Sequence, residues 1–255
     1  MSTWSIATWN VNSLKVRLPN VLRFVDETKP DVLCLQETRV SEAAFPRAPF
    51  EQRGYHLATV GTGGYAGVAI ASLDPIAEIV SGIITFQEDK APGRRLLGRV
   101  GTRWVDTVYV PTRTKIGKAA FLDALRADHD DRFAADAEVV LAGDFNICFD
   151  ERDYASPKLI SDPDVHPGRP EDLAFRRLVG GRFADCFRRV EEGGGHFTWF
   201  PNATWAMKRN YGMRLDYIFA SRSLAGRTVD ATHDRSVMAL PKPSDHVPVL
   251  VRFNV

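Results

Sequence analysis

The chain is divided into short apolar runs that stop at Gly, Pro or Asp. Runs of this length between turn-forming residues are typical of β-strands. We therefore predict strands over Ser5–Val11, Asp31–Gln36, Gly67–Ala71, Trp104–Val110, Glu138–Ala142, Leu215–Ala220 and Val247–Phe253. Strands of this kind must pack in sheets, so the pattern limits the chain to a fold built around β-structure.

Helical spacing of apolar residues appears between some of these strands. It predicts helices over Leu18–Thr28, Ala119–Ala127 and, after Pro170, Glu171–Val179. The order of helices and strands is mixed and does not alternate strictly. The segment Asp150–Pro170 concentrates Asp, Pro and His without periodicity, which predicts a long surface loop of the kind that often carries function.

Composition indicates an ordinary globular protein. Hydrophobic residues make up 44% and charged residues 25% of the 255 residues, and neither repeats nor a linker divide the chain. A single α/β or all-β domain can reach this size, so we predict one domain over residues 1–255. The net charge of +1 neither favours nor excludes a nucleic-acid partner, because a basic cleft can exist within a balanced total.

The cysteines and the first residues bear on location. Cys34, Cys148 and Cys186 lie far apart, so neither a thiolate zinc site nor a disulfide framework is indicated. The start of the chain lacks the basic and apolar regions of a signal peptide, and no apolar stretch is long enough to span a membrane. We expect a cytoplasmic protein without a membrane partner.

Polar side chains stand where several of the predicted strands end. They are Asn10, Gln36, Glu37, Tyr109, Asp144, Asn146, Asp216, Asp245 and His246. Each one alone has an ordinary structural interpretation: a Gly-Asp-Phe-Asn turn is usually only a turn, and Asp216 could pair with Arg214. Their joint occurrence favours a shared site, since ends of distant strands can meet at one edge of a sheet.

This set of residue types suits phosphodiester hydrolysis. Oxygen ligands from Glu, Asp and Asn match Mg²⁺ or Mn²⁺, and the lack of clustered His and Cys disfavours zinc. Cleavage of an anionic diester needs a Lewis acid, an aligned water and donors for the charge that grows on the phosphate. Asp can anchor or deprotonate the water, while His and Asn supply donors.

At this point the chain resembles a known family. The words ATWNVN, LQET, YVP, GDFNI, FTW, RLDY and SDHVP begin at Ala7, Leu35, Tyr109, Gly143, Phe197, Arg214 and Ser244, in the order found in exonuclease III and its abasic-endonuclease relatives. Together they span nearly the whole chain. The resemblance implies a deoxyribonuclease I-like four-layer α/β sandwich, in which helices flank two packed mixed β-sheets.

The resemblance also implies residue roles. Glu37 would be the main metal ligand, helped by Asn10, with Asp245 in the metal and phosphate shell beside Asn12. His246 would donate to the scissile phosphate and Asp216 would orient its imidazole. For the attacking water, Asp144 would act as base or anchor, with Asn146 and Tyr109 hydrogen-bonding nearby. The cofactor would be Mg²⁺, for which Mn²⁺ can substitute.

The implied substrate is double-stranded DNA with abasic sites or 3′ ends, handled by a monomer in base excision repair. Cleavage 5′ to the abasic site would leave a 3′-hydroxyl, and the same site would remove nucleotides 3′ to 5′ and clean 3′ ends. Trp199, Phe200 and Met213 resemble the apolar pocket for a sugar without its base, whereas Phe197 fits an ordinary core. The candidates for DNA phosphates are Arg94, Arg95, Lys115, Lys118, Lys208 and Arg209.

Some segments depart from the family pattern. Thr112-Arg113-Thr114 replaces the usual wording after YVP, the segment from Tyr109 to Asp144 is short, and Arg39 replaces a frequent Lys. Two alternatives therefore stay open: a related phosphodiesterase that acts on RNA, and a nucleic-acid-binding relative that has lost the reaction. Retention of every catalytic residue type favours an active enzyme over the second.

Overall fold

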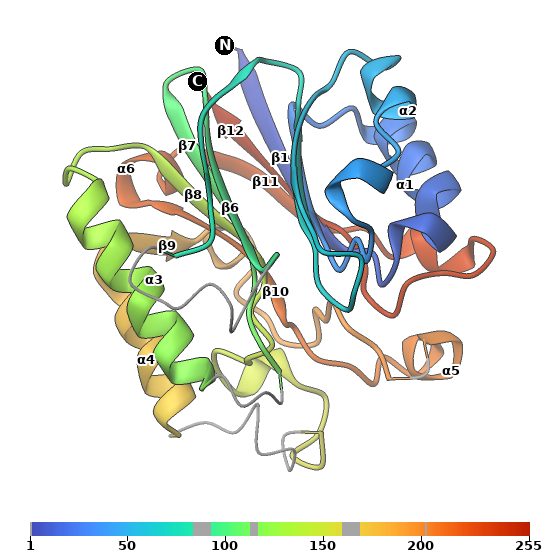
Figure 1. Ribbon diagram of the computed structural model, residues 1–255. Coiled ribbons are helices and arrows are strands. Elements are labelled where there is room, and N and C mark those ends of the chain that lie inside the picture. The colour runs from blue at the N-terminus through green and yellow to red at the C-terminus, as the bar shows by residue number, and fades with distance from the viewer. Residues whose placement is uncertain (1, 84–92, 113–116, 160–168, 202) are drawn as a thin grey trace.

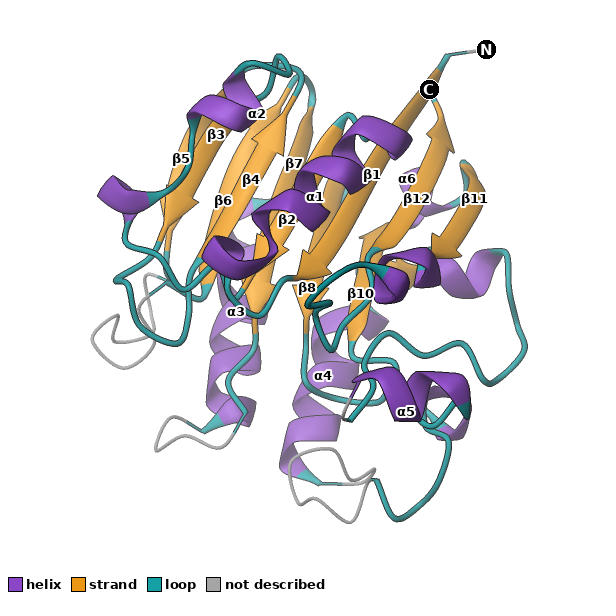
Figure 2. Cartoon of the chain, turned by 90° about the vertical axis from the view of Figure 1, so that its right-hand side faces the viewer, coloured by secondary structure: helices purple, strands orange, loops and turns teal. Residues whose placement is uncertain are grey.

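The computed structural model describes residues 2–83, 93–112, 117–159, 169–201 and 203–255, whose strands form two six-stranded sheets (Figure 2). The first has the order β11 (Thr228–His233), β12 (Val249–Asn254), β1 (Thr3–Asn10), β2 (Val32–Gln36), β4 (Val68–Ser72), β3 (His56–Val60). The second has the order β5 (Ile76–Ser81), β6 (Arg95–Val100), β7 (Arg103–Tyr109), β8 (Val139–Asp144), β10 (Asp216–Ser221), β9 (Phe183–Asp185). Both sheets are mixed, because β1 runs parallel to β2 and β7 to β8 while the other pairs are antiparallel.

Helices cover the outer faces of the two packed sheets. The helix α1 (Leu14–Thr28) and the short α2 (Ala48–Glu51) lie on the first sheet, and α3 (Lys118–Arg132) with α4 (Pro170–Gly180) lie on the second (Figure 1). Two more short helices, α5 (Ala203–Lys208) and α6 (Arg222–Ala225), lie in connections. This arrangement is the predicted four-layer sandwich.

Strand alternation explains why each sheet buries both faces. Successive side chains of a strand point to opposite faces. In β1, Ile6 packs in the cluster between the sheets, whereas Trp9 packs with Phe24 of α1. In β8, Val140 lies between the sheets and Leu141 packs in the cluster with α3 and α4. Strands buried on both faces read as continuous apolar runs, which is the pattern seen in the sequence.

The seven strands predicted from these runs all form, with boundaries shifted by at most two residues. The three predicted helices also form, although α1 begins earlier, at Leu14, which places Pro19 inside the helix and not in its first turn, and α3 extends to Arg132. The strands β3, β5, β6, β9 and β11 were not predicted. Of the predicted loop Asp150–Pro170, residues 160–168 lie outside the described residues.

A buried ion network ties α3 to the second sheet. Arg95 of β6 donates to both carboxylate oxygens of Asp106, at 2.7 to 3.1 Å, and to Asp128 of α3 at 2.8 Å. His129 of α3 lies 2.7 Å from Asp106 as well. Burial opposes the charged form of Asp106, but Arg95 and His129 outweigh it and lower the pKa of that carboxyl. Arg95 was a candidate for DNA phosphates, and that prediction is wrong because its side chain is fully buried.

Arg95→Met tests this network. The change leaves the buried Asp106 carboxylate with His129 alone and leaves Asp128 with Arg132 alone, so we expect a loss of about 3–5 kcal/mol in the free energy of unfolding. Arg99→Met on the same strand is the matched control: its partner Glu78 is exposed, so the expected loss is below about 1 kcal/mol. Urea unfolding of both variants measures the difference, and equal losses would contradict the role assigned to the network.

His233, at the end of β11, makes stability depend on pH. It stacks on Phe187 at 4.0 Å, and neither ring nitrogen has a hydrogen-bond partner among the described residues. Burial, then the nearby Arg214 and His196, lowers the pKa of His233 well below its usual value. The folded state therefore keeps the ring neutral, whereas the unfolded chain takes up a proton below about pH 6.5.

Stability should consequently fall as the pH drops below about 6.5, by about 1.4 kcal/mol per unit until the folded pKa is reached. His233→Phe keeps a ring against Phe187 and removes the titration, so its unfolding free energy should fall less steeply between about pH 6.5 and 5. Urea unfolding at several pH values measures the two slopes. Identical slopes would show that His233 takes up no proton on unfolding.

No helix in the described ranges is both long and apolar enough to cross a membrane.

Candidate active site

Strand direction brings the predicted polar residues to one edge of the sandwich. The parallel strands β1 and β2 both end there, and so do β7 and β8; the antiparallel β10 and β12 begin there. In the second sheet the register places Tyr109, Asp144 and Asp216 in one row across three strands. Both sheets therefore contribute to a single site.

Gly143 allows β8 to reach this edge in register. A Cβ at this position would lie 2.0 Å from the carbonyl oxygen of Val108, and the residue has φ of 147°. Only glycine tolerates both constraints. The Gly of the GDFN word therefore has a structural reason: it lets β8 approach β7 and carries Asp144 into the site.

Asn10 connects the two sheets at the centre of the site. Its Nδ2 donates to Glu37 Oε1 at 2.9 Å and to Asp144 Oδ2 at 2.8 Å, while its Oδ1 accepts from the Asn12 amide at 3.0 Å. Glu37 Oε2 accepts from the Arg39 guanidinium at 3.0 and 2.5 Å. Both oxygens of Glu37 are thus engaged, one by each neighbour.

His246 and Asp216 form an oriented pair facing Asp144. His246 Nδ1 lies 2.8 Å from Asp216 Oδ2, and Nε2 lies 3.8 Å from Asp144 Oδ2. Burial lowers the pKa of His246, but Asp216 and then Asp144 outweigh it and raise the pKa to about 10. The imidazole is therefore positively charged at neutral pH. Asp216 does not pair with Arg214, which binds Asp153 and Asp185 instead.

The pKa values of Asp144 and Tyr109 are also shifted from their usual values. Burial raises the pKa of Asp144 to about 7, with Asp216 adding to the rise and His246 opposing it. Burial, then Glu37 and Asp144, raises the pKa of Tyr109, so the phenol stays protonated and can donate. Arg94 lies over the Tyr109 ring at 4.6 Å and donates to its carbonyl at 3.3 Å. Clustered, perturbed titratable groups are typical of active sites.

Backbone strain is concentrated in the same loops. Asn12, Glu37, Arg39 and Asn146 have φ of 44°, 50°, 54° and 51°, in the left-handed region that residues other than glycine rarely adopt. Two hydrogen bonds hold Asn146 in this conformation. Its backbone N–H donates to Asp144 Oδ1 at 2.9 Å, and its side-chain Nδ2 donates to Val110 O at 3.0 Å. Such strain persists where surrounding contacts fix the backbone, most often at functional sites.

Asp245 is held by neighbours from distant parts of the chain. Its oxygens accept from Asn12 Nδ2 at 2.9 Å and Trp199 Nε1 at 3.1 Å. Burial alone would raise the pKa of Asp245. His246 and these hydrogen bonds outweigh burial, so the pKa of Asp245 lies below its usual value. Trp199 also forms a β-bridge with His246. Trp199 thus links the predicted sugar pocket to the acidic centre.

The acidic centre fits a hard divalent cation. Among the described His, Cys, Asp and Glu residues, one group of three brings its ligand atoms within 4.8 Å of one another: Asp144, Asp216 and His246. Asp216 Oδ1 is buried and lacks a hydrogen-bond partner in the described part of the chain. Two of these three are carboxylates, and Glu37, Asp245 and Asn10 bring further carboxylate and amide oxygens to the same edge, as Mg²⁺ and Mn²⁺ prefer.

The predicted sugar pocket is partly revised. A small apolar cluster beside the catalytic residues contains buried Cys148, Met213 and Leu215, against which Tyr154, Leu159 and Trp199 pack. Phe200 is 0% exposed in the core cluster around α1, so the prediction that it contacts substrate is wrong. Its side chain packs in that core cluster, whereas the side chain of Trp199 donates to Asp245. Phe197 is a core residue, as predicted.

The basic candidates divide by burial. Lys118 is 3% exposed and donates to the Asn146 carbonyl at 2.8 Å, so it supports the site from inside and its predicted contact with DNA is wrong. Lys208 and Arg209 lie at the surface beside α5, with Arg209 over the exposed Trp205 ring at 4.9 Å. Lys115 lies outside the described residues.

Thr198 is a site residue that sequence reasoning missed. Its Oγ1 accepts from the backbone amides of Leu215 at 3.0 Å and Asp216 at 3.1 Å, and so fixes the start of β10. The FTW word contained it, but nothing in that word indicates which backbone its hydroxyl meets.

Thr198→Val removes this acceptor while preserving the shape of the side chain. Two buried amides then lose their partner, so we expect a loss of about 1–3 kcal/mol in unfolding free energy. Thr198→Ser keeps the hydroxyl and should recover most of it. Urea unfolding compares the two variants; a Val variant as stable as the Ser variant would show that the amides find another acceptor.

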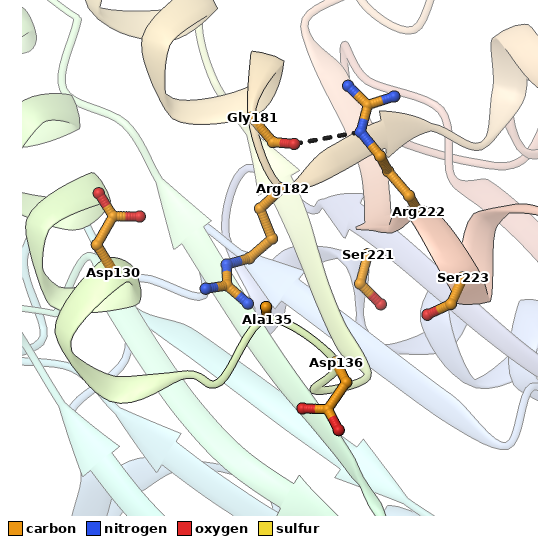
Figure 3. A pocket seen from close by; sticks show the side chains of 8 residues that line it. All are labelled: Asp130, Ala135, Asp136, Gly181, Arg182, Ser221, Arg222 and Ser223. Carbon is orange, nitrogen blue, oxygen red and sulfur yellow. Dashed lines mark hydrogen bonds between the residues drawn. The ribbon is translucent and has the colours of Figure 1, made fainter.

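A hollow at the other end of the second sheet is not part of this site. It is lined by Asp130, Ala135, Asp136, Gly181, Arg182, Ser221, Arg222 and Ser223 (Figure 3). Arg222 donates to Gly181 O at 3.2 Å, and Arg182 donates to the carbonyls after α3. Ser221 ends β10, which begins at the site with Asp216, so roughly 17 Å of strand separates the two places.

Comparison with known proteins agrees with this geometry. The model of the Endonuclease/Exonuclease/phosphatase family matches residues 7–246. An exodeoxyribonuclease of Bacillus subtilis is 29% identical over 98% of this chain and 99% of that protein. The structure of an AP endonuclease from Archaeoglobus fulgidus has a TM-score of 0.92 and 32% identity, covering 99% of this chain and all of that one. A 3′ phosphatase from Neisseria, bound to a product DNA hairpin, has a TM-score of 0.90 and 31% identity, covering 99% and 100%.

Proposed function

Because this chain belongs to the endonuclease/exonuclease/phosphatase family, we propose that it is a Mg²⁺-dependent DNA phosphodiesterase of base excision repair that cleaves 5′ to abasic sites. The resemblance to exonuclease III and the prediction of a nuclease-type hydrolase are both confirmed by the relatives. The observation that carries the proposal is the His246–Asp216 pair, which faces Asp144 at 3.8 Å, while Asn10 joins Asp144 to Glu37.

Each residue has a defined part in hydrolysis. Asp144, with its pKa raised to about 7, can hold a water and accept its proton near neutral pH. Charged His246 donates from Nε2 to a phosphate oxygen, because Asp216 occupies Nδ1. Neutral Tyr109 supplies a second donor, and Asn146 lies beside Asp144 to fix the water. Donors placed in advance stabilise charge as it develops on the phosphate.

Glu37, Asn10 and Asp245 are the residues proposed to hold the cation. Mg²⁺, or Mn²⁺ in its place, would supply a Lewis acid that polarises the phosphate. Asn10 and Arg39 keep the Glu37 carboxylate in place without it. Asp245 is kept ionised by His246 and its hydrogen bonds, which suits a ligand for a cation.

DNA is the proposed partner. One relative is described as a DNA repair nuclease, and a Neisseria neighbour holds a DNA hairpin. The apolar surface of Trp199 and Met213 favours a sugar without its base, with Asn12 and Arg94 close to the phosphate-binding edge. The same site would act at 3′ ends as an exonuclease and end-cleaning activity. A monomer with a cytoplasmic location stays a prediction from sequence.

A substrate panel with site variants tests the proposal. Duplex DNA with one abasic analogue, the intact duplex and a matching RNA duplex are each incubated with Mg²⁺ or with chelator. We expect Mg²⁺-dependent incision 5′ to the abasic analogue. Asp144→Asn, His246→Ala and Glu37→Ala should lower turnover at least about a hundredfold while the variants still bind DNA. Asp136→Asn, in the hollow at the far end, is the matched control.

Three results would decide against the proposal. Cleavage of RNA alone would favour the alternative of an RNA phosphodiesterase, and cleavage despite chelation would exclude metal dependence. Absence of all cleavage together with DNA binding would favour the inactive binding relative.

A further inference from the structure

Hydrogen bonds to the Asp153 carboxylate fix the loop around this residue beside the site. Six hydrogen bonds converge on the buried Asp153 carboxylate, two from Arg214, one from Arg188, one from the Tyr217 hydroxyl and two from the amides of residues 149 and 150. Asp153 is 0% exposed. A short 3-10 helix, Glu151–Asp153, therefore has a fixed position relative to β10.

This loop pairs with the segment before β10 that contains Met213. Tyr154 and Met213 form a β-bridge, and the Ala155 amide donates to Gly212 O at 3.0 Å. Met213 forms another bridge with Trp199 on its other side. The order Tyr154, Met213, Trp199 places Tyr154 at the far edge of the apolar cluster that Trp199 borders, and its ring packs on that cluster.

A polar groove lies on the other side of Tyr154. It has a volume of about 390 Å³, and its lining is Glu151, Arg152, Tyr154, Ala155, Gly194, Gly195, Phe197 and Asn210. Gly195 has φ of 83°, and a Cβ there would lie 3.4 Å from Asn210 Nδ2, so the glycine keeps the chain close to that wall. Of the groove residues, Tyr154 alone also packs on the apolar cluster.

The two sides of Tyr154 differ in what they can accept. Cys148, Met213 and Leu215 are at most 5% exposed, so a sugar would meet the partly buried side chains that cover them, Tyr154, Leu159 and Trp199. The groove offers volume for a base, and its walls are held in place because Arg152 bonds to Asp150 and the Glu192 carbonyl while the Asn210 amide donates to the Gly195 carbonyl. Tyr154 belongs to both, since it packs on the cluster and lines the groove, so a nucleoside that extends from the cluster surface into the groove would have to pass it.

We propose that Tyr154 is a specificity-determining residue, a wall that confines the bound sugar to the apolar cluster and excludes nucleotides that retain a base. This inference rests on the proposed function. The Tyr154 hydroxyl makes no hydrogen bond within the described ranges, and the backbone of its loop is held by Asp153, so truncation removes the wall and leaves the loop fastened. Truncation of Tyr154 should therefore remove the steric exclusion at little cost in stability, because it leaves no buried polar group without a hydrogen-bond partner.

Tyr154→Ala tests the wall. Two duplexes are compared, one with a tetrahydrofuran abasic analogue and one with a mismatched thymidine at the same place, and kcat/KM is measured for incision of each. We expect the ratio of thymidine to abasic incision to rise by about tenfold or more in Tyr154→Ala, the range that steric exclusion in a pocket provides. Tyr154→Phe restores the ring and should restore the wild-type ratio, which a loss of general stability would not do.

The outcomes separate the two proposals. If wild-type protein does not incise the abasic duplex, the proposed function fails. If it does, and Tyr154→Ala keeps the wild-type ratio, the wall is overturned and the proposed function stands. Thermal unfolding is followed for each variant; should the Ala variant be unfolded at the assay temperature, Tyr154→Leu, which is shorter but fills the apolar edge, is expected to raise the ratio by a smaller factor. An unchanged ratio in a folded Leu variant also overturns the wall.

Discussion

The contact of Asn10 with two carboxylates is the interaction on which the site depends. Asn10 ends a strand of the first sheet and Asp144 ends a strand of the second, so the amide that joins them also joins the sheets. Because Glu37 shares the same amide nitrogen, its position is set by the packing of the sandwich as a whole. The site therefore exists only when residues more than a hundred positions apart have packed together.

Burying several carboxylates close together is electrostatically unfavourable, and the site compensates some of them with positive charge but not all. Glu37 is compensated by Arg39, and Asp216 by His246 on one oxygen. The other Asp216 oxygen has no partner among the described residues, and burial keeps the pKa of Asp144 near neutrality. Unpaired buried carboxylate oxygen is unstable without further positive charge. This imbalance is what makes the centre suited to a divalent cation and to proton transfer.

Burial explains which parts of the fold the sequence could predict. Strands such as β1, β2 and β8 are covered on both faces, so they are apolar throughout and easily recognised. The missed β5 and β11 are edge strands, of which β5 is mostly exposed and β11 partly exposed, and β6 contains Arg95 and Arg99. Arg95 is buried only because Asp106 and Asp128 come to it from another strand and from a helix. No local pattern in β6 carries that information.

The same reasoning applies to the site. Residues at strand ends could be predicted because a polar residue after an apolar run is recognisable in the sequence. The direction in which the strand runs then decides which edge of the sheet that residue reaches. Which way a side chain faces is decided by pairing, and so Trp199 lies in the site while its neighbour Phe200 is in the core. Thr198 and Tyr154 were missed because their importance comes from contacts with β10 and with Met213, which lie well separated in sequence. A motif records what the chemistry requires, whereas the packing that brings Tyr154 beside Met213 leaves no comparable pattern in the sequence.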